Sequence, residues 1–343
     1  MRIKRIKPLL IAVTIIFLIS FGISQADSGF SKQWKHRKLY EAEILATFPP
    51  GTFLENLVAD KEGNLYITNI FEGTILKYSY ADNSVSEFAR IVGGSAGSIA
   101  IDHDGTIYGS GSMEGARAVL KIDKNGNVSR FMDLSQSQMQ SPNGWTYVKP
   151  GIFLICSAGA IWKLDVKNET LTEWLRDELL EKDYTNTHPA ANGIKLYKRF
   201  AFVSNSSQEK LLKITMDRDC NPVEIEVYRN IALDDFCVSE DGDIYGTTHP
   251  ENKIYLIKRK GEPEVIAEGE EDGVRGNSAA VFGKNKGDSK SIYVIGDGGW
   301  YEAMIEFWTT GKLDPNKMKP SALTRIYVGE KGYRQKGVCG GRE

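Results

Sequence analysis

The sequence predicts an all-β fold, a six-bladed β-propeller, on three observations. One phrase returns six times: an aliphatic strand, a turn, and a second strand that reads aliphatic, any residue, Lys, aliphatic, with Leu or Arg in place of Lys in two copies. The first strands of these phrases begin 42 to 48 residues apart, which is the period of a propeller blade. Acidic turns that contain glycine, such as those at residues 60–64, 102–105, 123–126 and 240–242, separate the strands. We expect the first strands at residues 65–69, 107–111, 153–157, 201–205, 244–248 and 292–296, and their partners around Lys77, Lys121, Lys163, Lys213, Leu256 and Arg325.

A propeller explains why the phrase must repeat. A single four-stranded sheet cannot bury both of its faces, whereas six sheets arranged radially bury each one against its neighbours and leave only short edges exposed. The inner strands then surround a central channel. Polar residues at equivalent positions of different repeats therefore meet at the axis, although they are tens of residues apart in the sequence.

Residues 1–26 read as a secretory signal peptide. Four basic residues lie within residues 1–7, and the apolar run 9–23 that follows ends in Ser24-Gln25-Ala26, which fits cleavage after Ala26. The apolar run is also long enough to be an uncleaved N-terminal membrane anchor. In either case we expect the folded part outside the cytoplasm, secreted or periplasmic, with membrane association only if the N-terminal segment is retained.

The rest of the chain reads as one domain. Residues 27–40 form a polar lead-in segment, residues 41–330 the propeller, and residues 331–343 a flexible tail. The sixth repeat carries an insertion at residues 300–320, partly helical and rich in aromatic residues, which is either a lid over the channel or a surface packing element or dimer contact. Without residues 1–26 the chain has 39 basic and 45 acidic residues, which argues against nucleic acid as a partner.

The cysteines and histidines form no metal-binding or catalytic motif. Cys156 and Cys237 lie in apolar strands and read as buried thiols, while Cys220 and Cys339 could form one bridge in an oxidising compartment. The four histidines are scattered, and His188 is an outside candidate for a catalytic base. The acidic turns lack the closing Glu of a twelve-residue calcium loop, so they are interpreted as turns without metal.

A polar phrase stands before the first strand of most repeats. It contains Glu55 in the first repeat, Asn143 in the third, Asn192 in the fourth, and Asp234 with Asp235 in the fifth. In a propeller these positions come together near one mouth of the channel and offer only carboxylate and amide oxygens. Such donors suit calcium, with magnesium or manganese as alternatives and zinc only in a promiscuous site.

Over residues 45–330 the chain resembles the regucalcin/gluconolactonase family of six-bladed, calcium-dependent lactonases. Glu55 opens the first blade, residues 191–194 read Ala-Asn-Gly-Ile and are similar to the family's P-N-G-I phrase, and residues 234–238 resemble its D-G-hydrophobic phrase. Residues 277–283 are similar to its closing T-S-x-x-F-G phrase, with Ser278 at the serine position.

The resemblance implies metal ligands at Glu55, Asn192 and Asp234, and substrate contacts at Asn143 and Ser278. The sequence departs from the family in three places: Asp235 replaces the usual Gly, residue 191 is Ala instead of Pro, and no R-x-N-D phrase precedes the third blade. The missing arginine removes the recognition of sugar hydroxyls, so a sugar lactone is not the expected substrate. The Asp-Asp-Phe phrase is closer to a branch of secreted lactonase-like proteins.

The resulting hypothesis is a hydrolase that acts on a small-molecule lactone or related ester. The cation polarises the carbonyl, and Asp234 or Asp235 takes a proton from the attacking water. The alternative is a non-catalytic propeller that binds a small molecule or a protein partner at the same mouth, because a propeller can lose activity without losing its fold. A condensing enzyme similar to strictosidine synthase would need a glutamate base late in the chain, a position that Glu302 and Glu306 fit poorly.

Overall fold

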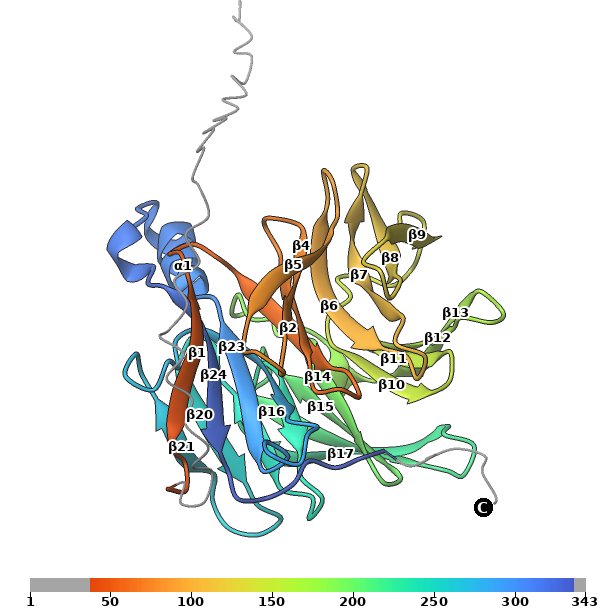
Figure 1. Cartoon of the computed structure of the whole chain (residues 1–343). Helices are drawn as coiled ribbons and strands as arrows, with labels where there is room; N and C mark the ends of the chain where they lie inside the picture. Colours follow the sequence, from red (N-terminus) through yellow and green to blue (C-terminus); the bar gives the residue numbers. More distant parts are fainter. Residues whose placement is uncertain (1–37, 336–343) are drawn as a thin grey trace, which may run out of the picture.

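The computed structural model describes residues 38–335 of the chain. They form six four-stranded antiparallel sheets arranged as a ring around a channel, the predicted six-bladed β-propeller (Figure 1). The signal segment, most of the lead-in segment and the last eight residues, which include Cys339, lie outside the described residues. Within residues 38–335, no helix has both the length and the apolar character needed to cross a membrane.

Each blade runs outward from an inner strand at the channel to an outer strand at the rim. The first three blades are β2 (Leu54–Ala59), β3 (Leu65–Asn69), β4 (Thr74–Tyr78) and β5 (Val85–Arg90); β6 (Ser95–Ile101), β7 (Ile107–Met113), β8 (Ala116–Ile122) and β9 (Val128–Asp133); and β10 (Trp145–Lys149), β11 (Ile152–Ser157), β12 (Ala160–Asp165) and β13 (Thr170–Arg176).

The fourth and fifth blades repeat this order, and the sixth takes its outer strand from the start of the domain. The strands are β14 (Ala191–Tyr197), β15 (Phe200–Asn205), β16 (Lys210–Met216) and β17 (Pro222–Asn230); β18 (Phe236–Val238), β19 (Ile244–Thr247), β20 (Lys253–Ile257) and β21 (Glu264–Glu268); and β22 (Asn277–Phe282), β23 (Ser291–Gly296), β24 (Ser321–Tyr327) and β1 (Ala42–Phe48).

The repeating phrase corresponds to the two central strands of every blade. The six strands predicted as first in each phrase are the second strands β3, β7, β11, β15, β19 and β23. They read as continuous apolar runs because other strands and blades cover both of their faces; β11, for example, is buried at five of its six positions. Outer strands are more exposed; β17, for example, is exposed at Glu224 and Glu226 and also at Val223, Val227 and Asn230.

Pairing of the two ends of the domain closes the ring. Strand β1 is antiparallel to β24, and Glu43 lies opposite Arg325 in this register. The Arg325 guanidinium, which is 1% exposed, donates a hydrogen bond of 2.6 Å to the Glu43 carboxylate. The first strand of the domain is thereby joined to its last blade.

The hydrophobic core is divided into six clusters, one between each pair of neighbouring blades. Leu54 and Leu57 of the first blade, for example, pack with Tyr293 and Leu323 of the sixth. Equivalent clusters join the other five pairs of blades. Because each blade buries its faces only against its neighbours, the inner strands are held at fixed positions around the channel.

Two segments cover opposite ends of the channel: the predicted insertion covers one end and residues 331–335 the other. We call the end where the inner strands begin the upper mouth and the end where they finish the lower mouth. The predicted insertion contains helix α1 (Trp300–Thr310) and the 3₁₀ turn Pro315–Lys317, at the upper mouth (Figure 1). A second 3₁₀ turn, Glu178–Leu180, follows β13.

The first part of the expected flexible tail is ordered against the lower mouth. The backbone N–H of Tyr333 donates to the Val238 carbonyl (2.8 Å), and the side chain of Gln335 donates to the Val148 carbonyl (2.6 Å). Residues 331–335 therefore differ from the expectation, because backbone and side-chain hydrogen bonds tie them to the inner strands of two blades.

Candidate functional site

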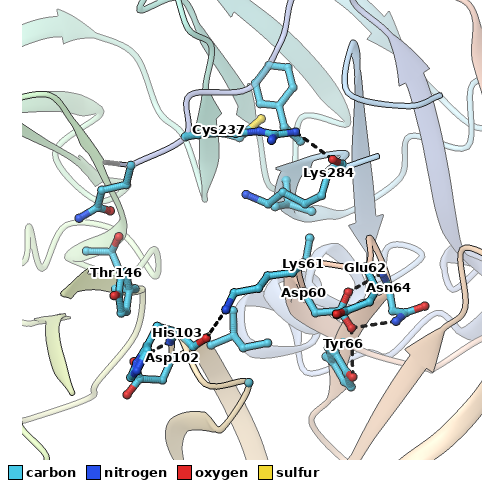
Figure 2. A pocket seen from close by; sticks show the side chains of 18 of the residues that line it. Asp60, Lys61, Glu62, Asn64, Tyr66, Asp102, His103, Thr146, Cys237 and Lys284 are labelled. Carbon is cyan, nitrogen blue, oxygen red and sulfur yellow. Dashed lines mark hydrogen bonds and ion pairs between the residues drawn. The ribbon is translucent and has the colours of Figure 1, made fainter. Parts of the chain in front are cut away.

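A cavity lies at each mouth of the channel. The cavity at the upper mouth, called the axial cavity here, has a volume of about 270 Å³, and the one at the lower mouth, the lower cavity, about 990 Å³ (Figure 2). Four of the predicted site residues, Glu55, Asn143, Asn192 and Asp234, gather at the axial cavity. It is lined by Phe53, Glu55, Ile70, Phe71, Asn143, Pro189, Asn192, Ser206, Asp234, His249, Trp300, Tyr301 and Trp308.

Bulges at the start of the inner strands turn the predicted ligands toward the axis. The pairing of β2 with β3 shifts its register between Leu54 and Leu57, so Glu55 lies in the irregular stretch. The pairing of β14 with β15 shifts between Ala191 and Ile194, which places Asn192 in an equivalent bulge. A β-bulge inserts an extra residue and re-aims side chains, and this accounts for polar residues pointing into the channel from otherwise apolar strands.

Two glycines allow the inner strands of the third, fourth and fifth blades to touch. The Gly144 N–H donates to the Asn192 carbonyl (3.0 Å), and the Gly193 N–H donates to the Asp234 carbonyl (3.1 Å). A Cβ atom on Gly144 would lie 2.3 Å from the Asn192 carbonyl oxygen, and one on Gly193 would lie 2.8 Å from the Cα atom of Asp235. The two Asn-Gly pairs, at residues 143–144 and 192–193, thus bring the side chains of Asn143, Asn192 and Asp234 together, in addition to making turns.

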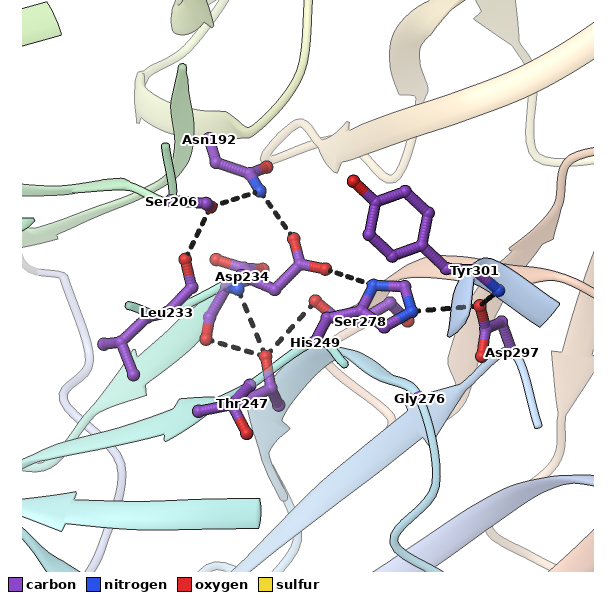
Figure 3. A network of polar contacts seen from close by, with 12 residues as sticks. Asn192, Ser206, Leu233, Asp234, Thr247, His249, Gly276, Ser278, Asp297 and Tyr301 are labelled. Carbon is purple, nitrogen blue, oxygen red and sulfur yellow. Dashed lines mark hydrogen bonds and ion pairs between the residues drawn. The ribbon is translucent and has the colours of Figure 1, made fainter. Parts of the chain in front are cut away.

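The side chains of Asn192 and Asp234 are bonded directly to each other (Figure 3). The Asn192 Nδ2 donates to Oδ1 of Asp234 at 2.7 Å, and to Oγ of Ser206 at 3.0 Å. The amide nitrogen is therefore occupied, and the Asn192 Oδ1 has no hydrogen-bond partner among residues 38–335. This oxygen is free to accept from, or to ligate, a group in the axial cavity.

His249 connects Asp234 to a second carboxylate (Figure 3). Its Nδ1 lies 3.0 Å from Oδ2 of Asp234, and its Nε2 lies 2.9 Å from Oδ2 of Asp297. Burial alone would lower the pKa of His249, but the charges of these two carboxylates and the hydrogen bonds to them raise it well above its ordinary value. The imidazole bridges the two carboxylates and holds Asp234 in one orientation.

Asp297 ties this chain of polar groups to helix α1. Its Oδ1 accepts from the Gly299 N–H (2.7 Å) and its Oδ2 from the Tyr301 N–H (2.7 Å), both at the start of the helix. The Tyr301 ring lies on His249, with a distance of 4.7 Å between ring centroids. The predicted insertion thus contributes Trp300, Tyr301 and Trp308 to the wall of the axial cavity.

Glu55 has a carboxyl group without a partner. It forms no hydrogen bond or ion pair with any residue from 38 to 335, and it lines the axial cavity. Burial, followed by the negative charge of Asp234, raises the pKa of Glu55 to about 8. A cation beside Glu55 and Asp234 would offset the repulsion between their two carboxylates.

Three other predicted residues have different surroundings. Asn143 lines the axial cavity, and its Oδ1 accepts from the Ser98 hydroxyl (3.2 Å). Asp235 does not line it; both carboxylate oxygens bond to the Lys195 ammonium at 2.6 and 2.7 Å on the other side of the inner strand. Burial raises the pKa of Asp235, against the effect of Lys195.

Ser278 is also absent from the cavity wall, because its hydroxyl donates to the Leu54 carbonyl (2.7 Å) and joins two blades.

Aromatic side chains form the outer wall of the axial cavity. The rings of Phe53, Phe71 and Trp300 contact one another with centroid distances of 4.7 to 5.6 Å. Phe71 and Trp308 are 55% and 53% exposed, although both are large apolar residues. The lining residues include no Lys or Arg, so an uncharged, apolar group fits this wall best.

Sequence reasoning missed His249 and Asp297. His249 follows β19 and Asp297 follows β23, each the second strand of a blade. The predicted site residues all come from the polar phrases that precede such strands. The signal that could have found them is their equivalent position: each stands one or two residues after the strand ends. His188 lies outside the wall of the axial cavity, with its ring 6.1 Å from that of Tyr301.

A separate group of titratable residues lies at the lower mouth. Asp102, His103 and Asp104 have side-chain atoms within 4.8 Å of one another, in the range for a shared metal ion. They are consecutive residues of an exposed turn, where the Asp102 carboxylate accepts from the Gly151 N–H (3.1 Å) and Asp104 from the Thr106 N–H (2.9 Å). The Asp104 bond lies within the turn, whereas the Asp102 bond joins the turn to the neighbouring blade.

Fold and site together define a β-propeller with an oxygen-rich polar site at one mouth of its channel. Lactonase drp35 from Staphylococcus saprophyticus is 21% identical over 243 residues, covering 65% of this chain and 72% of that protein. A gluconolactonase structure from Xanthomonas campestris has a TM-score of 0.60 at 11% identity, covering 83% and 89% of the two chains. The calcium-binding protein regucalcin from Agrobacterium tumefaciens has a TM-score of 0.62 at 14% identity, covering 86% and 96%. No protein-family model matches the chain.

These comparisons confirm the fold and the predicted resemblance to the regucalcin/gluconolactonase family. The likeness to the two solved structures extends around the whole ring, because it covers most of both chains. At such low identities it describes architecture, so the chemistry must be argued from the residues of this chain.

Proposed function

We propose that the protein hydrolyses a lactone or related ester at the axial cavity, with a calcium ion held by Glu55, Asn192 and Asp234. The observation that carries the proposal is the Glu55 carboxyl group, which has no hydrogen-bond partner among residues 38–335 and lies half-buried beside Asp234 and the amide oxygen of Asn192. Two carboxylates and one amide oxygen are hard donors, which suit calcium better than zinc. A cation at this point would also offset the repulsion that raises the pKa of Glu55.

The residues around the proposed cation have separate tasks. The ion would supply a positive charge that polarises the substrate carbonyl and stabilises the oxyanion formed during hydrolysis. Asp234 would accept a proton from the attacking water and pass it to the alkoxide oxygen released when the ring C–O bond breaks. His249 and Asp297 would orient Asp234, and the Asn143 side chain would hydrogen-bond the substrate.

The aromatic wall supports an apolar substrate. Phe71, Trp300 and Trp308 offer ring faces at the entrance, and the lining contains no Lys or Arg to bind a carboxylate or phosphate. A lactone or ester with an alkyl or aryl substituent would bury that substituent against these rings, which contributes on the order of 1.5–3 kcal/mol for a buried apolar group of side-chain size. A polyhydroxylated sugar lactone would lose its hydration without gaining hydrogen bonds there.

A location outside the cytoplasm remains part of the proposal. It is supported by Cys220, which is disulfide-bonded, because disulfides persist mainly in oxidising compartments. Cys339, the partner expected from the sequence, lies outside the described residues. Cys156 and Cys237 are free and buried, in agreement with the sequence interpretation.

Turnover of a lactone panel tests the proposal. The purified protein is assayed in calcium and in EDTA with phenyl- and alkyl-substituted lactones, gluconolactone and aryl esters. We expect turnover of the apolar substrates in calcium, and a loss of about a hundredfold or more in EDTA and in the Asp234→Asn variant. Absence of turnover for the entire panel in calcium would contradict the hydrolase and favour the non-catalytic binding module.

A further inference from the structure

The lower cavity has the composition of a ligand pocket and plays no part in the proposed hydrolysis. Its volume of about 990 Å³ lies at the upper end of the range for small-molecule sites. Ile101, Leu196, Val281 and Phe282 supply apolar surface, and polar and charged side chains make up much of the remaining wall. Figure 2 shows Lys61, Thr146, Cys237 and Lys284 arranged around the opening. Sites of this kind hold an apolar body and orient it by a few polar groups.

Lys284 carries a positive charge that has no counterion in this cavity. It follows β22 and is half-buried, and its ammonium forms no hydrogen bond or ion pair with residues 38–335. Burial, with a smaller contribution from the Arg334 guanidinium, lowers the pKa of Lys284. An unpaired ammonium in such surroundings is costly, and an anion placed beside it would recover that cost.

Three nearby carboxylates, those of Asp60, Asp102 and Asp104, already accept hydrogen bonds. Asp60 accepts from the backbone and side chain of Asn64, both at 2.8 Å. Asp102 accepts from the Gly151 N–H, and Asp104 from the Thr106 N–H. None of these acidic groups forms an ion pair with Lys284, so they do not compensate its charge.

The wall carries five basic residues besides Lys284, of which Lys77 lies over the Tyr66 ring and Lys124 is exposed. The Lys195 ammonium is paired with Asp235, and the Lys61 ammonium donates to the His103 carbonyl at 2.5 Å. Arg334 donates to the backbone carbonyl of Lys284 at 2.9 Å, which places a second positive charge at the same edge of the cavity. Two positive charges, those of Lys284 and Arg334, therefore lie at this edge of the cavity, while the rest of the wall combines apolar residues with charged residues of both signs.

We propose that the lower cavity is a second ligand site, which binds an amphipathic organic anion. Its carboxylate or sulfonate would pair with the Lys284 ammonium, and its apolar body would lie along Ile101, Leu196 and Phe282. The site is separated from the axial cavity by the length of the inner strands. Its ligand is therefore distinct from the substrate, and the proposal stands whether or not the protein is a hydrolase.

Calorimetric titration with octanoate in EDTA tests this site. The wild-type protein should bind one octanoate, whereas 1-octanol, with a similar apolar body and no charge, should bind at least about tenfold more weakly. The Lys284→Met variant should lose at least about tenfold in octanoate affinity, and Lys284→Arg should restore it to within about threefold. Lys286→Met, two residues away and exposed, is the matched control and should leave the affinity unchanged.

Two results would overturn the inference. One is evidence that Lys284 recognises no anion. This would be either the absence of binding at millimolar octanoate or equal binding by Lys284→Met and the wild type. The other is loss of binding in Trp308→Ala, because Trp308 lines the axial cavity and its effect would place the octanoate there. Thermal melts of each variant, measured in parallel, confirm that the compared proteins are folded.

Discussion

His249 holds the carboxylate of Asp234 from the side opposite Asn192. The Nδ1 atom of His249 lies 3.0 Å from Oδ2 of Asp234, while the Asn192 amide nitrogen occupies Oδ1 at 2.7 Å. Both oxygens of Asp234 are therefore oriented by neighbours from the fourth and fifth blades. A carboxylate fixed in this way can bind a cation or accept a proton with little reorganisation.

Replacing His249 tests this relationship. We expect His249→Gln to lower calcium affinity by about 10- to 100-fold, because a group that orients a metal ligand typically contributes that much. Turnover at saturating calcium should also fall, since the orientation of Asp234 is lost. His188→Gln is the matched control, as His188 contacts Tyr301 but no carboxylate of the site. Unchanged calcium affinity in His249→Gln would show that Asp234 needs no such support.

The raised pKa of Glu55 predicts how the metal-free protein responds to pH. The pKa is about 8 in the folded state and near 4.5 in the unfolded chain, so between these values the folded state holds the extra proton. The free energy of unfolding should therefore decrease as pH rises from about 4.5 to 8. Urea denaturation in EDTA at a series of pH values measures this slope for the wild type and for Glu55→Gln.

The difference between these two proteins isolates Glu55. Glu55→Gln should lose stability less steeply with rising pH than the wild type, because glutamine does not ionise. Calcium binding to the wild type should strengthen over the same range, as the ion displaces the Glu55 proton. Identical slopes for the two proteins would contradict the assignment of a raised pKa to Glu55.

The aromatic wall predicts a selective effect on substrates. Trp308→Ala should raise KM for a phenyl-substituted lactone by about tenfold, because it removes apolar surface that the substituent would contact. KM for the unsubstituted lactone should change much less. Phe307→Ala is the control: Phe307 is on the same helix and 40% exposed, but it does not line the axial cavity. Equal effects on both lactones would mean that Trp308 does not contact the substituent.

The contact between the fourth and fifth blades predicts a loss of stability. In Gly193→Ala the new Cβ would lie 2.4 Å from Oδ1 and 2.8 Å from Cα of Asp235, so the inner strands must separate. We expect a decrease of about 1–3 kcal/mol in the free energy of unfolding, measured with urea. Gly97 occupies the equivalent bulge of the second blade, where a Cβ would lie 3.2 Å from the Ser110 hydroxyl. Gly97→Ala should therefore cost less, and the reverse order would contradict this packing argument.

The architecture could be predicted because it depends on a repeated local pattern. The phrases around Lys77, Lys121 and Lys163 each pair with the strand before them, and apolar periodicity within such a hairpin is visible in the sequence. The order of the polar phrases likewise predicted that Glu55, Asn192 and Asp234 would meet at one cavity. Because the phrase repeats at a regular spacing, the place of a residue within its repeat predicts its place around the channel axis.

The direction of individual side chains could not be predicted in the same way. Asp234 and Asp235 are adjacent, and only the backbone geometry before β18 decides that Asp234 faces the axial cavity while Asp235 faces Lys195. His249 was missed because its role depends on Asp297, which is 48 residues away in the next blade. Such partners are determined by packing between blades, which leaves no local signal.

Calcium binding by Glu55→Gln tests the central claim most directly. Isothermal titration at neutral pH should show one calcium ion bound to the wild type, and a loss of at least about a hundredfold in affinity for Glu55→Gln, because a carboxylate ligand is removed. Glu271→Gln, an isosteric change at an exposed position, should bind calcium as the wild type does. Equal affinities for the wild type and Glu55→Gln, or no calcium bound by the wild type, would contradict the proposed site.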